Sequence, residues 1–455
     1  MMSQARRGVL LLVLVTAVGL LLTGAARPFA WPWSRPRNLI LIIVDTLRSD
    51  HVGCYGAELP TTPTIDSLAA CGTRFVHAYA TAPWTLPSIA SILTGRFPKS
   101  HGANRVGSLL SERALTLPEH LQKHGYATAG VVSHSLLAPR RGFAQGFEEY
   151  RTIVRRDHHN ALTTGAVTDT ALRMLEKLSR QERPYFLLVH YFDPHYNYLR
   201  HPEYGFAPDS AGRLSGDEDL EELQKLGTLT REEYAFLRAL YDEEIRHTDA
   251  GIGRLLGRLR QLDRRGKTAV ILTADHGEEF GRHQNLGHSR TLYEEVMRIP
   301  LIVQAPGRRS TRAPVNAEVS LVSLFPTVLD ILDVEADTLS FQGPSLVPLL
   351  TARGKGEAVY FGVDFEAYKA HKRGVLQARR KLIFDEATGG LELYDLRSDS
   401  TEQKNAVEAD SESVREILPI LVRYAKASRD GALPSEVRQL DQEEIEQLRS
   451  LGYIN

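Results

Sequence analysis

The sequence predicts an α/β protein with a doubly wound, mostly parallel sheet, followed by a small antiparallel sheet and one helix. Three observations lead to this prediction: continuous apolar runs of strand length, helical patterns between them, and short, closely spaced strands after about residue 354. Continuous apolar runs fit strands that are buried on both faces, as in parallel sheets. Strands that alternate with helices are typical of doubly wound folds.

The elements of the main sheet follow from these patterns. Buried strands are expected at residues 38–44, 128–132, 185–189, 268–273 and 301–303. Helices are expected at residues 64–70, 117–124, 163–178, 231–262 and 321–332. The polar, acidic segment 209–233 is expected to be an exposed excursion.

The last hundred residues have a different pattern. Short strands are expected at residues 359–363, 375–378, 381–384 and 391–395, with helices at 414–426 and 440–451. We therefore expect three parts: a signal or anchor segment with a linker (1–37), a main domain (38–353) and a C-terminal subdomain (354–455).

The N-terminus has the layout of an export signal. Arg6 and Arg7 precede an uncharged, Leu- and Val-rich run at 8–26. This run also has the roughly 20 residues that a membrane-spanning helix needs. A cleaved signal and an uncleaved membrane anchor both stay open. In either case we expect an extracytoplasmic protein, periplasmic or secreted.

The composition limits the classes of partner that we expect for this protein. The formal net charge is −1, and charged residues make up 24% of the chain. A nucleic-acid-binding protein would normally carry a basic excess, so nucleic acid is not expected as a partner. The two cysteines, Cys54 and Cys71, are interpreted as unpaired thiols. Oligomeric state is left open.

Two predicted strands end in residues that bind metals. The strand 38–44 runs into Asp45, and the strand 268–273 leads into Asp275 and His276. Ligands bind at the carboxyl ends of strands in open α/β sheets, so these side chains are expected to converge. Asp45 alone could equally be a helix N-cap, but the joint pattern favours a metal site.

Thr85 is the candidate nucleophile. Pro87 and Ser88 are typical of a helix start and Gly95 of its end, which places Thr85 just before the N-terminus. The helix dipole there favours an anion. A nearby divalent cation can draw off the hydroxyl proton of a threonine and make it nucleophilic.

Several motifs, in order, resemble those of the sulfatase family. They are VDTLRSD at 44–50, PSIASILTGR at 87–96, HYFDPH at 190–195, DHGE at 275–278, YEEVMRIPLI at 293–302 and QLRSLGY at 447–453. The resemblance runs from about residue 38 to the C-terminus. It implies the alkaline phosphatase-like fold, and chemistry on sulfate or phosphate esters.

The chain also departs from this family. Sulfatases convert a Cys to formylglycine, but the corresponding position is Thr85, and Ile89 replaces a supporting Arg. The paired Asp of calcium sulfatases reads Asp45-Thr46, and the Asp-Asn pair reads Asp275-His276. Formylglycine chemistry is therefore not expected.

The remaining set resembles the phosphoethanolamine and phosphoglycerol transferases, which use a metal-bound Thr. In these enzymes a His follows the Asp-His pair by twelve positions, as His288 does here. The expected cofactor is one divalent metal ion held by Asp45, Thr85, Asp275 and His276. An imidazole with few carboxylates favours zinc or manganese over calcium or magnesium.

The expected mechanism is attack by Thr85 on phosphorus or sulfur, giving a covalent Thr ester. His288 and His195 are expected to stabilise the transferred oxygens, and one of them to protonate the leaving group. Asn104, Arg48 and His134 are weaker candidates for substrate contacts. The substrate is expected to be a small-molecule, glycan or lipid ester.

Three functions remain open on this evidence: a Thr-dependent hydrolase or transferase, a true sulfatase that works without formylglycine, and a silent homologue that binds an anionic ligand. Other histidines are interpreted more plainly. His190, at the end of a strand, could be a packed neighbour of the site or a ligand.

Overall fold

The computed structural model describes residues 36–154, 162–218, 220–306, 314–336, 341–351, 354–450 and 453–454. Residues 35–455 group into one compact unit. The expected signal or anchor segment at 8–26 lies outside the described residues. Across the described ranges, every helix is too short or too polar to cross a membrane.

An eight-stranded sheet forms the centre of the protein, in the order β11-β2-β10-β7-β1-β6-β4-β5. The strands are β1 (Asn38–Val44), β2 (Thr73–Tyr79), β4 (Ala127–Val132), β5 (Glu149–Thr152), β6 (Tyr185–Tyr191), β7 (Thr268–Ala274), β10 (Arg298–Gln304) and β11 (Val315–Ser320). The inner strands β1, β6, β4 and β7 pair in parallel and are almost completely buried, because helices cover both faces. The predicted fold class is therefore confirmed.

Three features of the sheet differ from the sequence-based expectation. β10 runs antiparallel to both β7 and β2. The outer strands β2, β5 and β11 were not predicted, because their side chains are only partly buried and many are polar. The segment 209–233 is not simply exposed, since its apolar side chains Ala211, Leu214 and Leu229 are buried.

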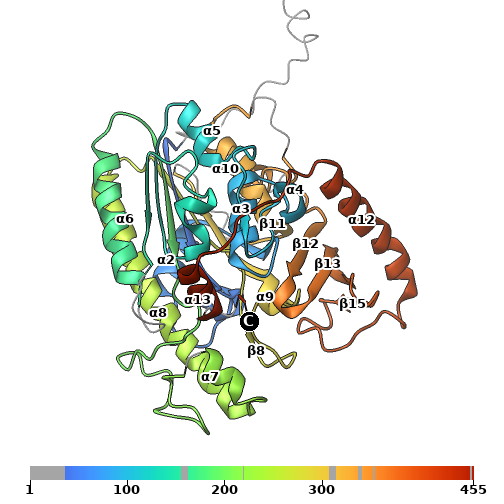
Figure 1. Ribbon diagram of the computed structural model, residues 1–455. Coiled ribbons are helices and arrows are strands. Elements are labelled where there is room, and N and C mark those ends of the chain that lie inside the picture. The colour runs from blue at the N-terminus through green and yellow to red at the C-terminus, as the bar shows by residue number, and fades with distance from the viewer. Residues whose placement is uncertain are drawn as a thin grey trace, which may run out of the picture. The chain divides into compact units, whose positions relative to one another are not determined.

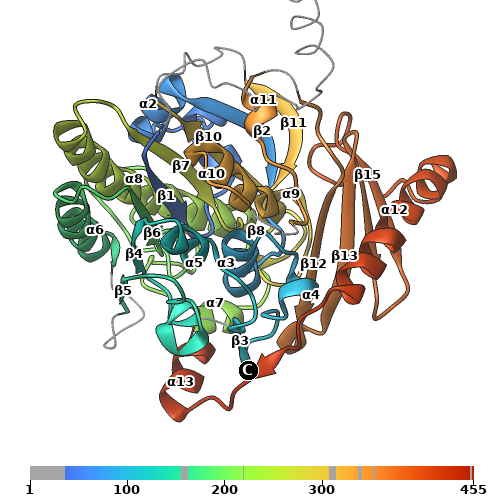
Figure 2. The same ribbon diagram turned by 90° about the horizontal axis from the view of Figure 1, so that it is seen from above.

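Helices cover the sheet on both faces, with α2, α6 and α8 on one side and α3, α5 and α10 on the other (Figures 1 and 2). The helices are α2 (Pro63–Cys71), α3 (Thr85–Thr94), α4 (Pro98–His101), α5 (Leu117–Lys123), α6 (Thr164–Ser179), α7 (Leu220–Lys225), α8 (Arg231–Leu262), α9 (Glu294–Met297), α10 (Leu324–Leu332), α11 (Val347–Leu350), α12 (Ser411–Asp430) and α13 (Gln442–Ser450). Short 3-10 turns are η1 (Ser49–His51), η2 (Gly53–Tyr55), η3 (Ser135–Leu137), η4 (Pro139–Arg141), η5 (Leu321–Ser323) and η6 (Glu366–Tyr368).

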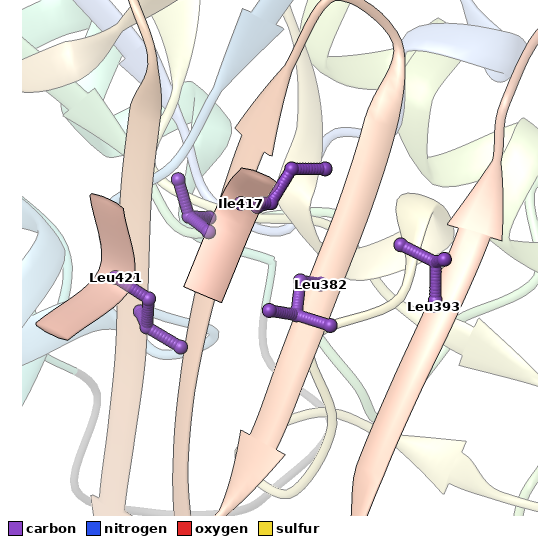
Figure 3. Packing of buried hydrophobic residues seen from close by; sticks show 5 residues of the cluster. Leu382, Leu393, Ile417 and Leu421 are labelled. Carbon is purple, nitrogen blue, oxygen red and sulfur yellow. The ribbon is translucent and has the colours of Figure 1, made fainter. Parts of the chain in front are cut away.

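A second, four-stranded antiparallel sheet lies beside the main one, as predicted. Its strands are β12 (Val359–Phe365), β13 (Ala370–Gln377), β14 (Arg380–Asp385) and β15 (Leu391–Asp395), in that order. Ile417 and Leu421 of α12 pack on Leu382 and Leu393 of this sheet (Figure 3). Two small ribbons pair β3 (Ser108–Leu109) with β16 (Glu436–Val437), and β8 (Glu279–Phe280) with β9 (Leu286–Gly287).

Candidate active site

Asp45, Asp275 and His276 meet at the carboxyl ends of β1 and β7. The parallel register aligns Val44 with Ala274, so the residues that follow emerge side by side. The His276 Nε2 atom lies 3.5 Å from Asp45 Oδ1 and 3.5 Å from Asp275 Oδ2. All three side chains have no exposed surface. The structure thus brings together the three residues that the sequence analysis proposed as metal ligands.

His190 joins this group from the neighbouring strand β6. Its register partner is Ile43, and its Nε2 atom lies 3.6 Å from Asp45 Oδ2. Neither ring nitrogen has a hydrogen-bond partner, although the side chain is fully buried. Burial lowers the pKa of His190 to about 4, so the imidazole is neutral and has a lone pair available.

The polar atoms of this cluster fit a metal ion. Asp45 Oδ1 and Asp275 Oδ2 are buried without a hydrogen-bond partner, as are the nitrogens of His190. One ligand atom from each of these three residues can lie within 4.8 Å of the others. Unpaired buried carboxylates are costly, and a divalent cation offsets that cost. The donor set therefore suits a cation with mixed oxygen and nitrogen ligands.

Thr85 is the first residue of α3 and faces this cluster. Its Oγ1 atom lies 3.3 Å from His276 Nε2 and 3.5 Å from Asp45 Oδ2. The Ser88 hydroxyl donates a 2.6 Å hydrogen bond to the Asp275 carbonyl and so ties the first turn of α3 to the end of β7. Gly95 ends the helix in the left-handed conformation (φ 64°) that glycine favours. Thr85 is thus held at a helix N-terminus, beside the proposed ligands.

Three imidazoles face Thr85 from other strand ends and loops. His134 follows β4, His195 follows β6, and His288 follows the β8–β9 ribbon. Their Nε2 atoms lie 3.3, 3.4 and 3.3 Å from one atom, the hydroxyl oxygen of Tyr453. The same hydroxyl lies 3.3 Å from Thr85 Oγ1. Tyr453 was not among the predicted site residues, because its sequence signal was only a place in a family-like tail.

The hydrogen bonds of the Nδ1 atoms fix how these rings present Nε2. His134 Nδ1 accepts from the Leu136 N–H, so its Nε2 carries a proton. His195 Nδ1 donates to the Tyr196 carbonyl, and His288 Nδ1 lies 2.9 Å from Glu278 Oε1. Burial and the neighbouring imidazoles lower the pKa values of all three histidines, and burial raises the pKa of Glu278 to about 8. His134 can therefore donate from Nε2 to an anionic oxygen, and so can His288 when the protonated Glu278 donates to its Nδ1, whereas the neutral His195 ring presents a lone pair on Nε2.

Of the three weaker candidates, His134 lies in the site, and Arg48 and Asn104 lie elsewhere. Arg48 is buried, and its guanidinium group binds Asp50 at 2.7 Å and donates to the Glu278 carbonyl at 2.8 Å. These bonds occupy the group and hold the loop after Asp275. Asn104 lines a neighbouring pocket together with Trp84 and Lys99.

The fold and the buried cluster fit an α/β enzyme with a site for a cation, and the family is given by sequence comparison. A family model described as "Sulfatase" matches residues 37–334, more than half of the chain. A second model, described as "N-sulphoglucosamine sulphohydrolase, C-terminal", matches residues 281–429. The protein therefore belongs to the sulfatase family, a metal-dependent family of ester-hydrolysing enzymes within the alkaline phosphatase superfamily.

Relatives cover most of the chain at low identity. An N-acetylglucosamine-6-O-sulfatase of Bacteroides thetaiotaomicron is 26% identical over 517 residues, covering 92% of this chain and 91% of the relative. Iduronate 2-sulfatase of Mus musculus is 27% identical over 331 residues, covering 60% of each chain.

Solved structures share the fold. One, determined in complex with its substrate D-glucosamine-2-N,6-O-disulfate, has a TM-score of 0.74 and 24% identity, covering 87% of this chain and 99% of its own. A phosphonate monoester hydrolase of Agrobacterium radiobacter has a TM-score of 0.69 and 22% identity, covering 89% of this chain and 100% of its own. At these identities the likeness concerns the fold alone.

Proposed function

We propose that this sulfatase-family protein hydrolyses sulfate- or phosphate-type esters with Thr85 as the nucleophile. The observation that carries the proposal is the position of Thr85 Oγ1, 3.3 Å from His276 Nε2 and 3.5 Å from Asp45 Oδ2. Thr85 stands where the resemblance to sulfatases places the formylglycine precursor, and Ile89 stands in place of a supporting Arg. Direct use of the threonine hydroxyl accounts for both departures.

Asp45, Asp275 and His276 would hold one divalent metal ion, and we add His190 to this set. Two imidazoles with two carboxylates favour zinc or manganese over calcium or magnesium. When bound, such an ion supplies positive charge that lowers the pKa of a nearby hydroxyl and stabilises anionic oxygens.

The two oxygens of Asp45 have different surroundings. Oδ1 has no hydrogen-bond partner, while Oδ2 faces the Thr85 hydroxyl. Asp45 Oδ2 is therefore the atom placed to accept the Thr85 proton. A bond then forms from Thr85 Oγ1 to sulfur or phosphorus as the bond to the alcohol oxygen breaks in line.

The imidazoles act on the transferred oxygens and on the leaving alcohol. His134 and His288 donate hydrogen bonds to the transferred oxygens, and His195 does so when its ring is protonated on both nitrogens. His288, whose Nδ1 atom is paired with Glu278, is the group placed to carry a proton to the departing alcohol. Water next attacks the Thr85 ester, which releases sulfate or phosphate and returns a hydrogen to Oγ1. An acceptor alcohol in place of water would make the same enzyme a transferase.

The relatives suggest what the alcohol part is. One curated relative is named for N-acetylglucosamine 6-O-sulfate, and one structural neighbour was solved with a disulfated glucosamine. We infer a small-molecule or glycan ester as substrate. The segment 8–26 would export the protein, either as a cleaved signal or as an anchor, and residues 38–353 and 354–455 would form the catalytic domain and its C-terminal subdomain.

The second candidate is a true sulfatase that is specific for sulfate esters and works without formylglycine. The names of the curated relatives favour it. Parallel assays with aryl sulfate, aryl phosphate and aryl phosphonate esters separate this candidate from a broader phosphate or phosphonate esterase. A rate measured only with the sulfate ester would select the true sulfatase.

The nucleophile is tested with two substitutions of similar size. Thr85→Val removes the hydroxyl and keeps the shape, so turnover should fall by about 10³-fold or more. Thr85→Ser keeps a hydroxyl and should retain measurable turnover. Mass spectrometry of the Thr85 peptide after brief exposure to substrate should find a phospho- or sulfo-adduct in the wild type and none in Thr85→Val.

Metal content is measured alongside by elemental analysis. Thr85→Val should keep metal, because other side chains supply most of the ligands. Turnover that persists in Thr85→Val would refute the nucleophile assignment. A wild-type protein that is free of metal and inactive on all three esters would instead indicate the silent homologue.

A further inference from the structure

The end of the chain enters the candidate active site. Tyr453 is 1% exposed, and its hydroxyl lies within 3.3–3.4 Å of Thr85 Oγ1 and of the Nε2 atoms of His134, His195 and His288. Its ring lies beside Trp84 and Phe365, at centroid distances of 6.0 and 6.1 Å, and those two rings lie 5.1 Å from each other. One tyrosine oxygen therefore makes the contacts that the proposed mechanism gives to the oxygens of a substrate anion.

The distance to the nucleophile decides between two roles for this hydroxyl. In a bound ester the reacting atom lies about 3–3.5 Å from the nucleophile. The leaving oxygen then points away from the nucleophile, because the displacement is in line. A group that protonates this oxygen must lie beyond it, whereas the Tyr453 hydroxyl is only 3.3 Å from Thr85 Oγ1. The hydroxyl thus occupies the position of the sulfuryl or phosphoryl group, and the two exclude each other.

The segment that carries Tyr453 is anchored by the pairing of β16 with β3, and beyond β16 it is attached by few side chains. Between α12 and α13, which lie far apart in Figure 2, most of residues 431–441 are exposed. α13 is held by the buried Leu448 and by Glu444, which pairs with Arg140 at 2.9 Å and Arg141 at 3.4 Å. Segments with few buried apolar contacts open at low free-energy cost. The tail can therefore leave while the main sheet stays folded.

A cavity of about 400 Å³ adjoins the tail. Tyr453 and Ile454 form part of its wall, together with Arg105, Asp364 and Glu366. Departure of the tail would connect this space with Thr85. A small polar alcohol group, such as a sugar ring, could then extend from the anion position into it.

We propose that the described carboxy-terminal residues, α13 together with Tyr453 and Ile454, form a lid over the anion position, with Tyr453 in the place of the substrate anion until that anion displaces it. The proposal rests on the proposed function in one respect: it takes the position of the Tyr453 hydroxyl as the place where the substrate anion binds. It does not require Thr85 to be the nucleophile, so the two can fail separately.

The affinity of the metal-containing protein for inorganic phosphate and sulfate, measured by calorimetry, tests the lid. A site that is open in 10% of molecules or fewer binds at least about tenfold more weakly than an open one. Tyr453→Ala, and a chain that ends at Arg449, should therefore bind these anions at least about tenfold more tightly than the wild type. Tyr453→Phe, which keeps the ring, should show a smaller gain. Tyr185→Phe is the matched control, because it removes a buried hydroxyl at the opposite end of β6 and should leave affinity unchanged.

Trypsin reports the movement directly, because cleavage after Arg449 releases Tyr453. Phosphate should accelerate this cleavage several-fold in the wild type, and in Thr85→Val as well. Unchanged cleavage with bound anion, or tighter binding by the wild type than by Tyr453→Ala, would overturn the lid. So would a failure of every variant to bind either anion. A drop in turnover in Tyr453→Phe without tighter anion binding would make Tyr453 a fixed part of the catalytic machinery instead.

Discussion

Residues that follow strand ends were the most predictable part of the site. Asp45 and Asp275 come directly after buried strands, and parallel strands deliver their ends to one edge of the sheet. Tyr453 could not be inferred in this way, since it reaches the site only through the docking of α13, 165 residues after His288. Arg48 was expected at the pocket edge, but it is bound to Asp50, two residues away, which the sequence pattern alone did not indicate.

His190 illustrates a residue whose role needs the structure. Its strand-end position left packing and metal binding equally open, and the structure adds two buried ring nitrogens without a partner. We predict that His190→Phe, which keeps the ring volume, weakens metal binding by at least about tenfold. Competition with a chromophoric chelator measures this affinity without relying on activity. The exposed His124→Phe is the control, and equal affinities in the two variants would exclude His190 from the ligand set.

At the scale of elements, strands buried on both faces were recognised, whereas the partly buried strands β2, β5 and β11, at the two edges of the sheet, were not. β1 and β7 are continuous apolar runs, which few other elements produce. β11 reads VNAEVS, and only its last two residues are buried, so its side chains give no clear period. The direction of β10 was also missed, because an apolar run carries no information on which way its neighbours run.

A buried ion cluster joins the two sheets, and its loss should be costly. Lys381 of β14 lies 3.0 Å from Glu294 of α9 and 2.8 Å from Glu402, with its side chain fully buried. Lys381→Met would remove the cation that two buried carboxyl groups share and would leave Glu402 without it, so we predict a loss of about 3–5 kcal/mol in the free energy of unfolding. Urea titration measures this loss.

The control for this prediction is an exposed pair. Lys177 binds Glu149 at 2.7 Å, but its side chain is 67% exposed. Lys177→Met should cost less than about 1 kcal/mol, because solvent screens such pairs. If the two variants lose similar free energy of unfolding, then burial does not make the Lys381 ion pairs more important for stability than the exposed Lys177 pair.

At the scale of the whole molecule, the two-sheet architecture followed from the sequence, but the order of strands did not. The change in strand length and spacing after residue 354 separates the parallel from the antiparallel sheet. Strand order depends on which faces the crossover helices cover, and that is decided by packing between residues far apart in sequence. The same long-range packing also sets how stability responds to pH.

His101 should make folding stability fall in acid. It is fully buried, its Nδ1 accepts from the Ala103 N–H at 3.1 Å, and its Nε2 lies 3.2 Å from the Pro87 carbonyl. Burial lowers its pKa to about 3, against about 6.5 for an unfolded histidine. Below about pH 6.5, His101 therefore binds a proton in the unfolded chain but stays neutral in the folded chain. The stabilisation by His101 is complete above that pH and is lost toward pH 3, by about 1.4 kcal/mol per unit.

The His101→Gln substitution isolates this effect, because glutamine keeps a donor and an acceptor but does not titrate. Urea unfolding of wild type and variant at pH 7, 6, 5 and 4 gives the difference in stability at each pH, in which the other titrating groups cancel. That difference should stay constant near pH 7 and then shrink by about 1.4 kcal/mol for each unit of acidification. A constant difference would mean that His101 is protonated in the folded state. The hydrogen bond to Pro87, which supports the first turn of α3 beneath Thr85, would then have to be assigned to a charged ring.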